Sequence, residues 1–269
     1  MDPAELGARR DAAARIAEAA GAHAAAMRDA GMGIATLKGA QDFLTEADGA
    51  TEQFIRDALA REFPGEAILG EELGGAPADS GWLWVIDPID GTANFARGSD
   101  RWCVSIGLVH DGRAVAGAVA RQAPKELFAG AEGLGATLND APIRPAATRD
   151  ITRAIVEIGW SLRRPAAAYP AMIAAAMRQG IGTRCAGSGA LGIVECACGR
   201  LDGYLELHIN AWDTAAALAI ARAAGSWTSA HDSGAWLREG NPIGVGAPAL
   251  GPPLAALLDE SERQPRRNP

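Results

Sequence analysis

The chain has 269 residues, of which 48% are hydrophobic, so it can bury the core of one large domain or of two coupled smaller ones. Its 33 acidic residues outnumber its 25 basic residues, and the net charge of −8 argues against broad electrostatic binding to a nucleic acid or to an anionic membrane. Because the first residues lack the architecture of a secretory signal and no uncharged apolar stretch approaches the ~20 residues of a membrane-spanning helix, we expect a cytoplasmic protein with reduced cysteines.

The N-terminal part of the chain is predicted to form two helices. Residues 3–29 are rich in alanine and carry apolar residues at helical spacing. A second helix is predicted over 45–63, where Thr45 and Asp48 resemble a capping arrangement and a Pro-Gly pair follows the apolar stripe. We therefore expect two helices before any strand.

Short runs typical of β-strands come next. They cover residues 67–69, 82–86, 104–110 and 114–120. The last two are joined by Asp111 and Gly112, a strong signal for a type I′ hairpin. This portion is therefore predicted to be antiparallel.

The second half of the chain alternates between strand and helix signals. The predicted elements are a strand over 154–158, a helix over 166–178, a helix opening near Ser188, a strand over 203–207 and a helix over 213–224 closed by Gly225. This alternation favours an α/β fold with helices layered on a sheet. A junction near 139–144 would divide the chain into sub-domains 1–140 and 141–269, with the functional site at their interface.

The most informative stretch is WVIDPIDGTANF at residues 84–95. An apolar strand delivers Asp87 at its end, and Pro88 with Gly91 forces a turn that re-aims Asp90. A short helix is predicted to begin at Gly91 and Thr92. Two close carboxylates suit a hard cation such as Mg²⁺, and the unpaired N–H groups of a helix start suit a phosphate. For the D-x-x-D spacing alone, a turn residue and a helix cap would be the favoured interpretation, and the whole twelve-residue stretch shifts the balance toward a binding site.

Two further acidic segments stand far from this stretch in the sequence. Glu71 and Glu72 lie in a loop directly after a short apolar strand, where acids are usually just solvated. Asp213 lies in the first turn of an alanine-rich helix, where an ordinary N-cap is the simplest interpretation. Neither segment alone indicates a function.

Together, these segments resemble the inositol monophosphatase family of Mg²⁺-dependent, lithium-sensitive sugar phosphatases. The resemblance runs from about residue 37 to residue 225 and is carried by GEE at 70–72, DPIDGTANF at 87–95 and WDTAA at 212–216. It implies a layered αβαβα sandwich of the sugar phosphatase type, with an antiparallel-rich N-terminal sheet, and a homodimer.

The resemblance also implies a set of metal ligands. Glu71, Asp87 and the carbonyl of Ile89 would hold one Mg²⁺ ion. Asp87, Asp90 and Asp213 would hold a second, so that Asp87 bridges the two ions. Glu71 would further order a weakly bound third ion and the attacking water, which makes it both ligand and catalytic residue.

The same resemblance assigns two more catalytic residues. The hydroxyl of Thr92 and the carboxylate of Asp48 would orient or deprotonate the nucleophile. Asp48 belongs to a stretch, with Lys38, Asp42 and Thr45, that resembles the family's own. Asp48 therefore has a catalytic interpretation beside the capping one.

The implied chemistry is direct attack of water on phosphorus, without a covalent phospho-enzyme. Two or three Mg²⁺ ions can neutralise the phosphate dianion and lower the pKa of a bound water. The N–H groups of Gly91 and Thr92 would hold non-bridging phosphate oxygens.

Substrate contacts follow from the resemblance less directly. The candidates that would face the sugar ring are Asp90, Gly187, Ser188, Gly189 and Glu206. Glu206 lies on a predicted strand and could instead face solvent. Ser161 and His208 are fainter candidates.

We expect a phosphatase of a small polyol phosphate, with inositol-1-phosphate first among the substrates. Histidinol phosphate, fructose-1,6-bisphosphate and 3′-phosphoadenosine phosphate are alternatives within the same chemistry. A different class of function is a regulatory protein that binds the transcription machinery.

Overall fold

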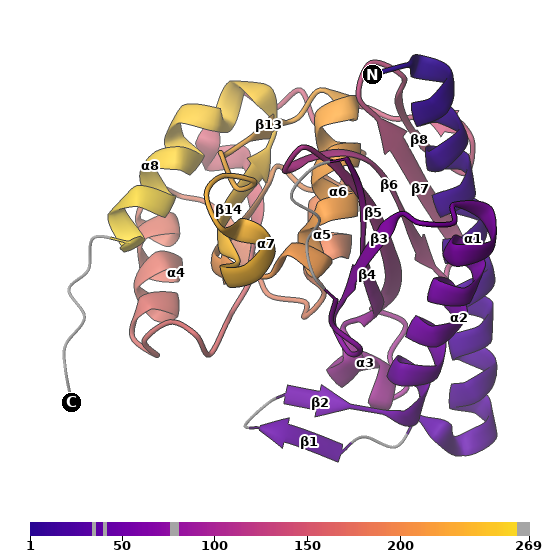
Figure 1. Ribbon diagram of the computed structural model, residues 1–269. Helices are drawn as coiled ribbons and strands as arrows, with labels where there is room; N and C mark the ends of the chain where they lie inside the picture. The colour runs from indigo at the N-terminus through magenta and orange to yellow at the C-terminus, as the bar shows by residue number, and fades with distance from the viewer. Residues whose placement is uncertain (34–35, 40–41, 76–80, 263–269) are drawn as a thin grey trace.

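The computed structural model describes residues 1–33, 36–39, 42–75 and 81–262, with the side chains of 37–43 and 260–262 outside the description. Helices and sheets alternate in five layers (Figure 1). Helices α1 and α2 cover one face of a seven-stranded sheet, and α5 with α6 cover its other face. A five-stranded sheet lies beyond α5, and α4 with α8 form the outer layer. The αβαβα sandwich predicted from the sequence is confirmed.

The first layer is built from small residues. Helix α1 (Pro3–Met27) begins after Asp2, whose side chain accepts a hydrogen bond from the N–H of Ala4 at 3.0 Å. The helix buries alanines on one face, so its axis comes close to the sheet; they are Ala12, Ala13, Ala17, Ala20 and Ala24. A π-helical turn (Arg28–Met32) follows α1 directly. Helix α2 (Glu46–Glu62) begins after Thr45, as the capping pattern predicts.

A short hairpin lies between these two helices. Strands β1 (Thr36–Gly39) and β2 (Asp42–Leu44) pair antiparallel, so the expectation of two helices before any strand is wrong. Strands of four and three residues are too short to show an alternating pattern in the sequence. The side chains of Lys38 and Asp42, which belong to the Asp48 stretch, lie outside the described residues.

The large sheet runs in the order β3-β4-β5-β6-β7-β8-β9. Its strands are β3 (Ala67–Gly70), β4 (Trp82–Asp90), β5 (Cys103–His110), β6 (Arg113–Arg121), β7 (Glu126–Ala131), β8 (Gly135–Leu138) and β9 (Ala141–Pro142). All neighbours pair antiparallel except β3 and β4, which are parallel. Asp111 and Gly112 both have positive φ, 49° and 78°, and form the predicted I′ hairpin.

The second sheet runs in the order β11-β10-β12-β14-β13. Its strands are β10 (Ile155–Ile158), β11 (Gly182–Arg184), β12 (Gly203–Ile209), β13 (Trp227–Thr228) and β14 (Asn241–Gly246). The remaining helical segments are α3 (Thr92–Ala96), α4 (Ala168–Arg178), α7 (Trp236–Glu239), α8 (Gly251–Glu262) and two 3₁₀ turns, Ile151–Arg153 and Pro248–Leu250. Within the described residues, none of these helices is long and apolar enough to cross a membrane.

The central layer fixes the position of the site. Helix α5 (Gly189–Ala197) and helix α6 (Ala211–Ala224) lie between the sheets (Figure 1). Gly107 on β5 and Gly117 on β6 face α6 so closely that an added Cβ would lie 2.6 Å from the N of Ala216 and 2.5 Å from its Cα. Only glycine permits this approach, which brings the start of α6 to the end of β4.

Candidate active site

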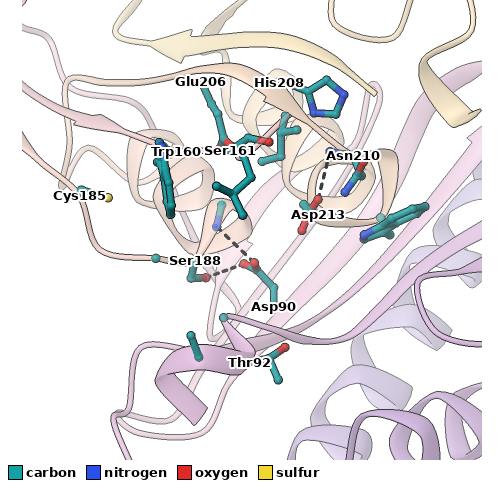
Figure 2. A pocket seen from close by; sticks show the side chains of 18 of the residues that line it. Asp90, Thr92, Trp160, Ser161, Cys185, Ser188, Glu206, His208, Asn210 and Asp213 are labelled. Carbon is teal, nitrogen blue, oxygen red and sulfur yellow. Dashed lines mark hydrogen bonds between the residues drawn. The ribbon is translucent and has the colours of Figure 1, made fainter. Parts of the chain in front are cut away.

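Three carboxylates from two distant segments meet at the end of β4. Asp87 and Asp90 lie in β4, Asp213 lies in α6, and one ligand oxygen of each lies within 4.8 Å of the others. The β4–β5 register shifts between Asp87 and Asp90, as expected from a Pro88 turn that re-aims the second acid. Figure 2 shows Asp90 and Asp213 pointing into one pocket.

Asp87 is the buried centre of this cluster. Its Oδ1 accepts a hydrogen bond from the N–H of Ile89 at 2.9 Å, while its Oδ2 has no hydrogen-bond partner among the described residues. Burial raises the pKa of Asp87 well above its ordinary value, and the charges of Glu71, Asp90 and Asp213 raise it further. A buried, unpartnered carboxylate oxygen among other acids is a place that a cation would fill.

Asp90 is held by the start of α5. Its carboxylate accepts from the hydroxyl of Ser188 at 2.5 Å, from the N–H of Ala190 at 2.8 Å and from the N–H of Gly189 at 3.3 Å. Figure 2 shows Ser188 and Asp90 turned toward one another. Burial raises the pKa of Asp90, and these donors oppose the shift.

Asp213 is the third residue of α6 and not its N-cap. The helix begins two residues earlier than predicted, with Asn210 as the N-cap, and the Asp213 carboxylate accepts from the N–H of Asn210 at 3.1 Å. Burial, followed by the charge of Asp90, raises the pKa of Asp213 to about 7. The capping contact and a place in the carboxylate cluster are therefore compatible.

Glu71 lies in the turn after β3 and lines the same pocket. Its N–H donates to the carbonyl of Ile86 at 3.3 Å, which ties the turn to β4. Its side chain is not in the group of three within 4.8 Å, but its charge raises the pKa of Asp87. The structure thus brings three of the four predicted acidic ligands into contact range of one another and places the fourth beside them.

Asp48 serves two elements with its two oxygens. Its Oδ2 accepts from the N–H and hydroxyl of Thr45 at 2.8 and 2.5 Å, which is the capping contact. Its Oδ1 lies 3.2 Å from the hydroxyl of Thr92, which also lies 3.0 Å from the carbonyl of Ile89. Asp48 therefore makes both contacts, the capping contact to Thr45 and the contact to the hydroxyl of Thr92.

Gly91 shapes the turn between β4 and α3. Its φ of 93° is left-handed, and an added Cβ would lie 2.8 Å from the carbonyl of Arg101 and 3.1 Å from that of Gly187. Both the backbone conformation and the space admit only glycine. Thr92 then begins α3, so the N–H groups proposed to hold phosphate lie at a helix start.

These residues border a cavity of about 820 Å³ between the two halves of the molecule. The predicted residues that line it are Glu71, Asp90, Gly91, Thr92, Gly187, Ser188, Gly189, Glu206 and Asp213, with Ser161 and His208. Three others, Asp48, Asp87 and Ile89, are buried. The cavity is therefore large enough for a small phosphate ester beside the carboxylate cluster.

Glu206 lies on the cavity wall and not in solvent. The residue is 7% exposed, and its Oε2 accepts from the hydroxyl of Tyr204 at 2.5 Å. Burial raises the pKa of Glu206 to about 8, with smaller contributions from Asp213 and Asp90. The solvent-facing interpretation of Glu206 is wrong, because Glu206 lies on the same face of β12 as Tyr204, and this face packs against the central helix layer.

A sequence model of the inositol monophosphatase family matches residues 2–263. The chain belongs to this family. It is therefore a phosphatase that acts on phosphoric monoesters, and its family is metal-dependent. The chain is 40% identical over 198 residues to an inositol-1-monophosphatase from Synechocystis, covering 72% of this chain and 68% of the relative. It is 36% identical over 212 residues to a protein from Haemophilus influenzae named Nus factor SuhB, covering 77% and 79%.

Solved structures of the family share the fold. The inositol monophosphatase from Anabaena superposes with a TM-score of 0.82 at 32% identity, covering 95% of this chain and 97% of that one. The extragenic suppressor protein suhB from Bartonella henselae gives 0.85 at 29% identity, covering 94% and 99%. A third neighbour, SaIMPase-II with inositol monophosphate bound, gives 0.78 at 26% identity, covering 94% and 95%.

The donor set of the family's site in this chain fits a divalent metal. Asp87, Asp90 and Asp213 offer only oxygen ligands, which hard cations prefer. A cation would supply the partner that Oδ2 of Asp87 lacks in the part of the chain that the structure describes, and it would lower the raised pKa values of all three acids.

Sequence reasoning missed several residues of the cavity wall. Trp160, Arg163 and Cys185 line it, and Trp160 is 45% exposed. Arg163 lies near enough to lower the pKa of Asp213. A signal existed, because the loop that carries Trp160 and Arg163 directly follows the predicted strand over 154–158, where loops often carry function.

Proposed function

We propose that this phosphatase hydrolyses a small polyol phosphate monoester in the presence of Mg²⁺, with inositol-1-phosphate as its first candidate substrate. The supporting observation is the cluster of Asp87, Asp90 and Asp213 beside a cavity whose wall carries the buried acceptor Glu206. A phosphate would lie against the cluster, and ring hydroxyls would lie against the wall.

The proposed metal ligands are Asp87, Asp90 and Asp213, with Glu71 and the carbonyl of Ile89 completing the set. Two or three Mg²⁺ ions would neutralise the phosphate dianion and lower the pKa of water for direct attack. Before metal binds, the acidic cluster would repel an anionic substrate. Substrate binding is therefore expected to require metal.

Other residues would orient the reacting groups. Asp48 Oδ1 is the acceptor for Thr92, and this pair would align the attacking water and take part in its deprotonation. The N–H groups of Gly91 and Thr92 would donate to non-bridging phosphate oxygens. No side-chain nucleophile is assigned, in keeping with direct attack by water.

The substrate ring would contact the start of α5 and the end of β12. The backbone of Gly187, Ser188 and Gly189 lines the cavity, and Glu206 would accept hydrogen bonds from ring hydroxyls. Asp90 would lie between the metal cluster and these ring contacts. This arrangement supports a hydroxyl-rich alcohol over an apolar one.

The relatives support the same substrate class. One is named an inositol-1-monophosphatase, and one structural neighbour holds inositol monophosphate.

We further propose that the protein is a cytoplasmic homodimer whose sub-domains are 1–140 and 141–269.

The test is a panel of phosphate monoesters assayed for released phosphate. Inositol-1-phosphate should be hydrolysed with Mg²⁺, not with EDTA, and less when Li⁺ is added. Histidinol phosphate, fructose-1,6-bisphosphate and 3′-phosphoadenosine phosphate belong in the same panel, because a higher kcat/KM for one of them would replace inositol-1-phosphate. Hydrolysis of no ester with Mg²⁺ present would refute the proposal.

A second candidate function is regulatory binding to the transcription machinery. It is supported by relatives named Nus factor SuhB, such as the one from Haemophilus influenzae. The variant Asp90→Ala separates the two functions. If the cellular role depends on catalysis, the variant should abolish the phenotype that the wild-type protein confers on the cell. If the role depends on partner binding, that phenotype should stay unchanged.

A further inference from the structure

A cluster of two arginines and two buried glutamates lies beside the active site. The guanidinium of Arg101 contacts Glu157 at 2.9 Å and Glu195 at 2.5 Å. Arg184 contacts the same two glutamates, with 2.9 Å to Glu157. The side chains of Arg101, Glu157 and Glu195 are 15%, 2% and 7% exposed. The side chain of Arg184 is 39% exposed, so the two buried carboxylates are balanced by one largely buried and one partly exposed guanidinium.

Arg101 differs from the other three members in its place in the fold. Glu157 lies on β10, Arg184 on β11 and Glu195 on α5, whereas Arg101 lies between α3 and β5. Its side chain therefore joins the segment that follows the metal-binding strand to the second sheet and the central helix layer. Because each glutamate is bound by two guanidinium groups, the position of the Arg101 side chain is tightly defined.

The main chain of Arg101 joins the same two parts at the active site. Its carbonyl accepts from the Nδ2 of Asn94 at 2.9 Å, and the same Nδ2 lies 2.9 Å from the carbonyl of Ala186 and 3.1 Å from that of Gly187. Gly91 packs against the carbonyls of Arg101 and Gly187, as its lack of space for a Cβ shows. The turn at Gly91 and the start of α5 are thus held together through Arg101.

We propose that Arg101 is a positioning residue, which sets the distance between the phosphate-binding turn at Gly91 and the substrate-facing start of α5 at Gly187. The inference rests on the proposed function, because that function assigns phosphate to the turn at Gly91. Arg101 touches neither substrate nor metal in this scheme. It acts through Asn94 and through the two glutamates.

The variant Arg101→Met removes both ion pairs and keeps an unbranched apolar side chain in place of the aliphatic part of arginine. We expect the KM of the substrate and the Kd of inorganic phosphate, measured by calorimetry on Mg²⁺-loaded protein, to rise about tenfold each, since small misplacements of binding groups are costly. The Kd of Mg²⁺ should stay within about threefold, because the ligands are not contacted by the Arg101 side chain. Arg101→Lys should give an intermediate loss, because an ammonium cannot bridge two carboxylates as a guanidinium does.

The double variant Arg101→Met/Glu195→Met separates positioning from stability. It leaves Glu157 with Arg184, so charge balance is restored in the cluster while the bridge to the first half stays broken. We expect it to regain the melting temperature lost in Arg101→Met but not the affinity for inorganic phosphate. Recovery of phosphate affinity together with stability would show that Arg101 only balances charge, and would overturn the inference.

A matched control is Arg222→Met. Arg222 is also a partly buried arginine, 20% exposed, and it forms a two-pronged ion pair with Asp232 at 2.5 and 2.6 Å. Arg222 lies at the far end of α6. The variant Arg222→Met should therefore lower stability without changing phosphate affinity. An unchanged phosphate affinity in Arg101→Met, or an equal loss in Arg222→Met, would also overturn the inference. If the wild type hydrolyses no ester, the proposed function fails on its own, and the phosphate affinities still decide the role of Arg101.

Discussion

Asp48 and Thr92 meet across 44 positions of sequence, with the Thr92 hydroxyl 3.2 Å from Oδ1 of Asp48. The other oxygen of Asp48 caps α2 through Thr45. One carboxylate therefore fixes the start of a helix and presents an acceptor to the candidate active site. Burial raises the pKa of Asp48 above its ordinary value, whereas its hydrogen bonds to Thr45 and Thr92 oppose the shift.

The two contacts of Asp48 can be separated by substitution. Thr92→Val removes the hydroxyl that faces Oδ1, and we expect kcat to fall about 100-fold with little change in melting temperature. Thr45→Ala removes only a capping hydroxyl, and the free energy of unfolding should fall by about 1 kcal/mol while most activity remains. Steady-state kinetics measures the change in kcat, and thermal melts measure the change in stability. A Thr92→Val enzyme with full kcat would remove the Asp48–Thr92 pair from the mechanism.

Asp87→Asn tests the metal cluster through stability as well as activity. Because Oδ2 of Asp87 is buried beside other acids and has no hydrogen-bond partner among the described residues, the variant should be more stable than wild type in EDTA by about 1–3 kcal/mol. Phosphate release should fall by orders of magnitude. Added Mg²⁺ should raise the melting temperature of wild type, by mass action, and leave that of the variant nearly unchanged.

The control for Asp87→Asn is Asp11→Asn, which changes an exposed carboxylate on α1 with 64% of its side chain accessible. It should alter neither the activity nor the response to Mg²⁺. An Asp87→Asn protein that is still stabilised by Mg²⁺ as strongly as wild type would count against the assigned cluster.

The raised pKa of Glu206 predicts how the free energy of unfolding depends on pH in the absence of metal. Its pKa is about 8 in the folded protein and near 4.5 when unperturbed, so the folded state binds a proton that the unfolded state has lost between these values. Stability therefore falls as pH rises from about 4.5 to about 8. Glu206→Gln should reduce this slope, which urea unfolding in EDTA at several pH values measures. An equal slope in both proteins would mean that Glu206 titrates normally.

Gly91 and Gly65 form a matched pair of left-handed glycines. Their φ values are 93° and 90°, but an added Cβ meets backbone carbonyls at Gly91 and open space at Gly65. Gly65→Ala should cost about 1 kcal/mol from the backbone conformation alone. Gly91→Ala should cost about 2–5 kcal/mol and lower kcat/KM, because the clash adds to the strain and shifts the turn. Equal losses in the two variants would show that the turn tolerates a side chain.

Local patterns in the sequence determined much of the fold. The cap at Thr45, the Asp111-Gly112 hairpin and the glycine at the end of α6 each act on neighbouring residues, so they are readable without the rest of the chain. The acidic motifs also identified the family, and three of the acids they named, Asp87, Asp90 and Asp213, lie together in the structure. The β1–β2 hairpin escaped prediction because its strands are too short to carry a period.

Tertiary structure decided which of these residues meet. Close packing of α6 on Gly107 and Gly117 brings Asp213 to Asp87, a convergence that follows from the shape of the interior and not from spacing along the chain. The double use of Asp48 and the bridge made by Arg101 likewise depend on partners distant in sequence. The sequence alone therefore identified the family and the chemistry that we propose, whereas burial and long-range packing set the charges and distances at the candidate site.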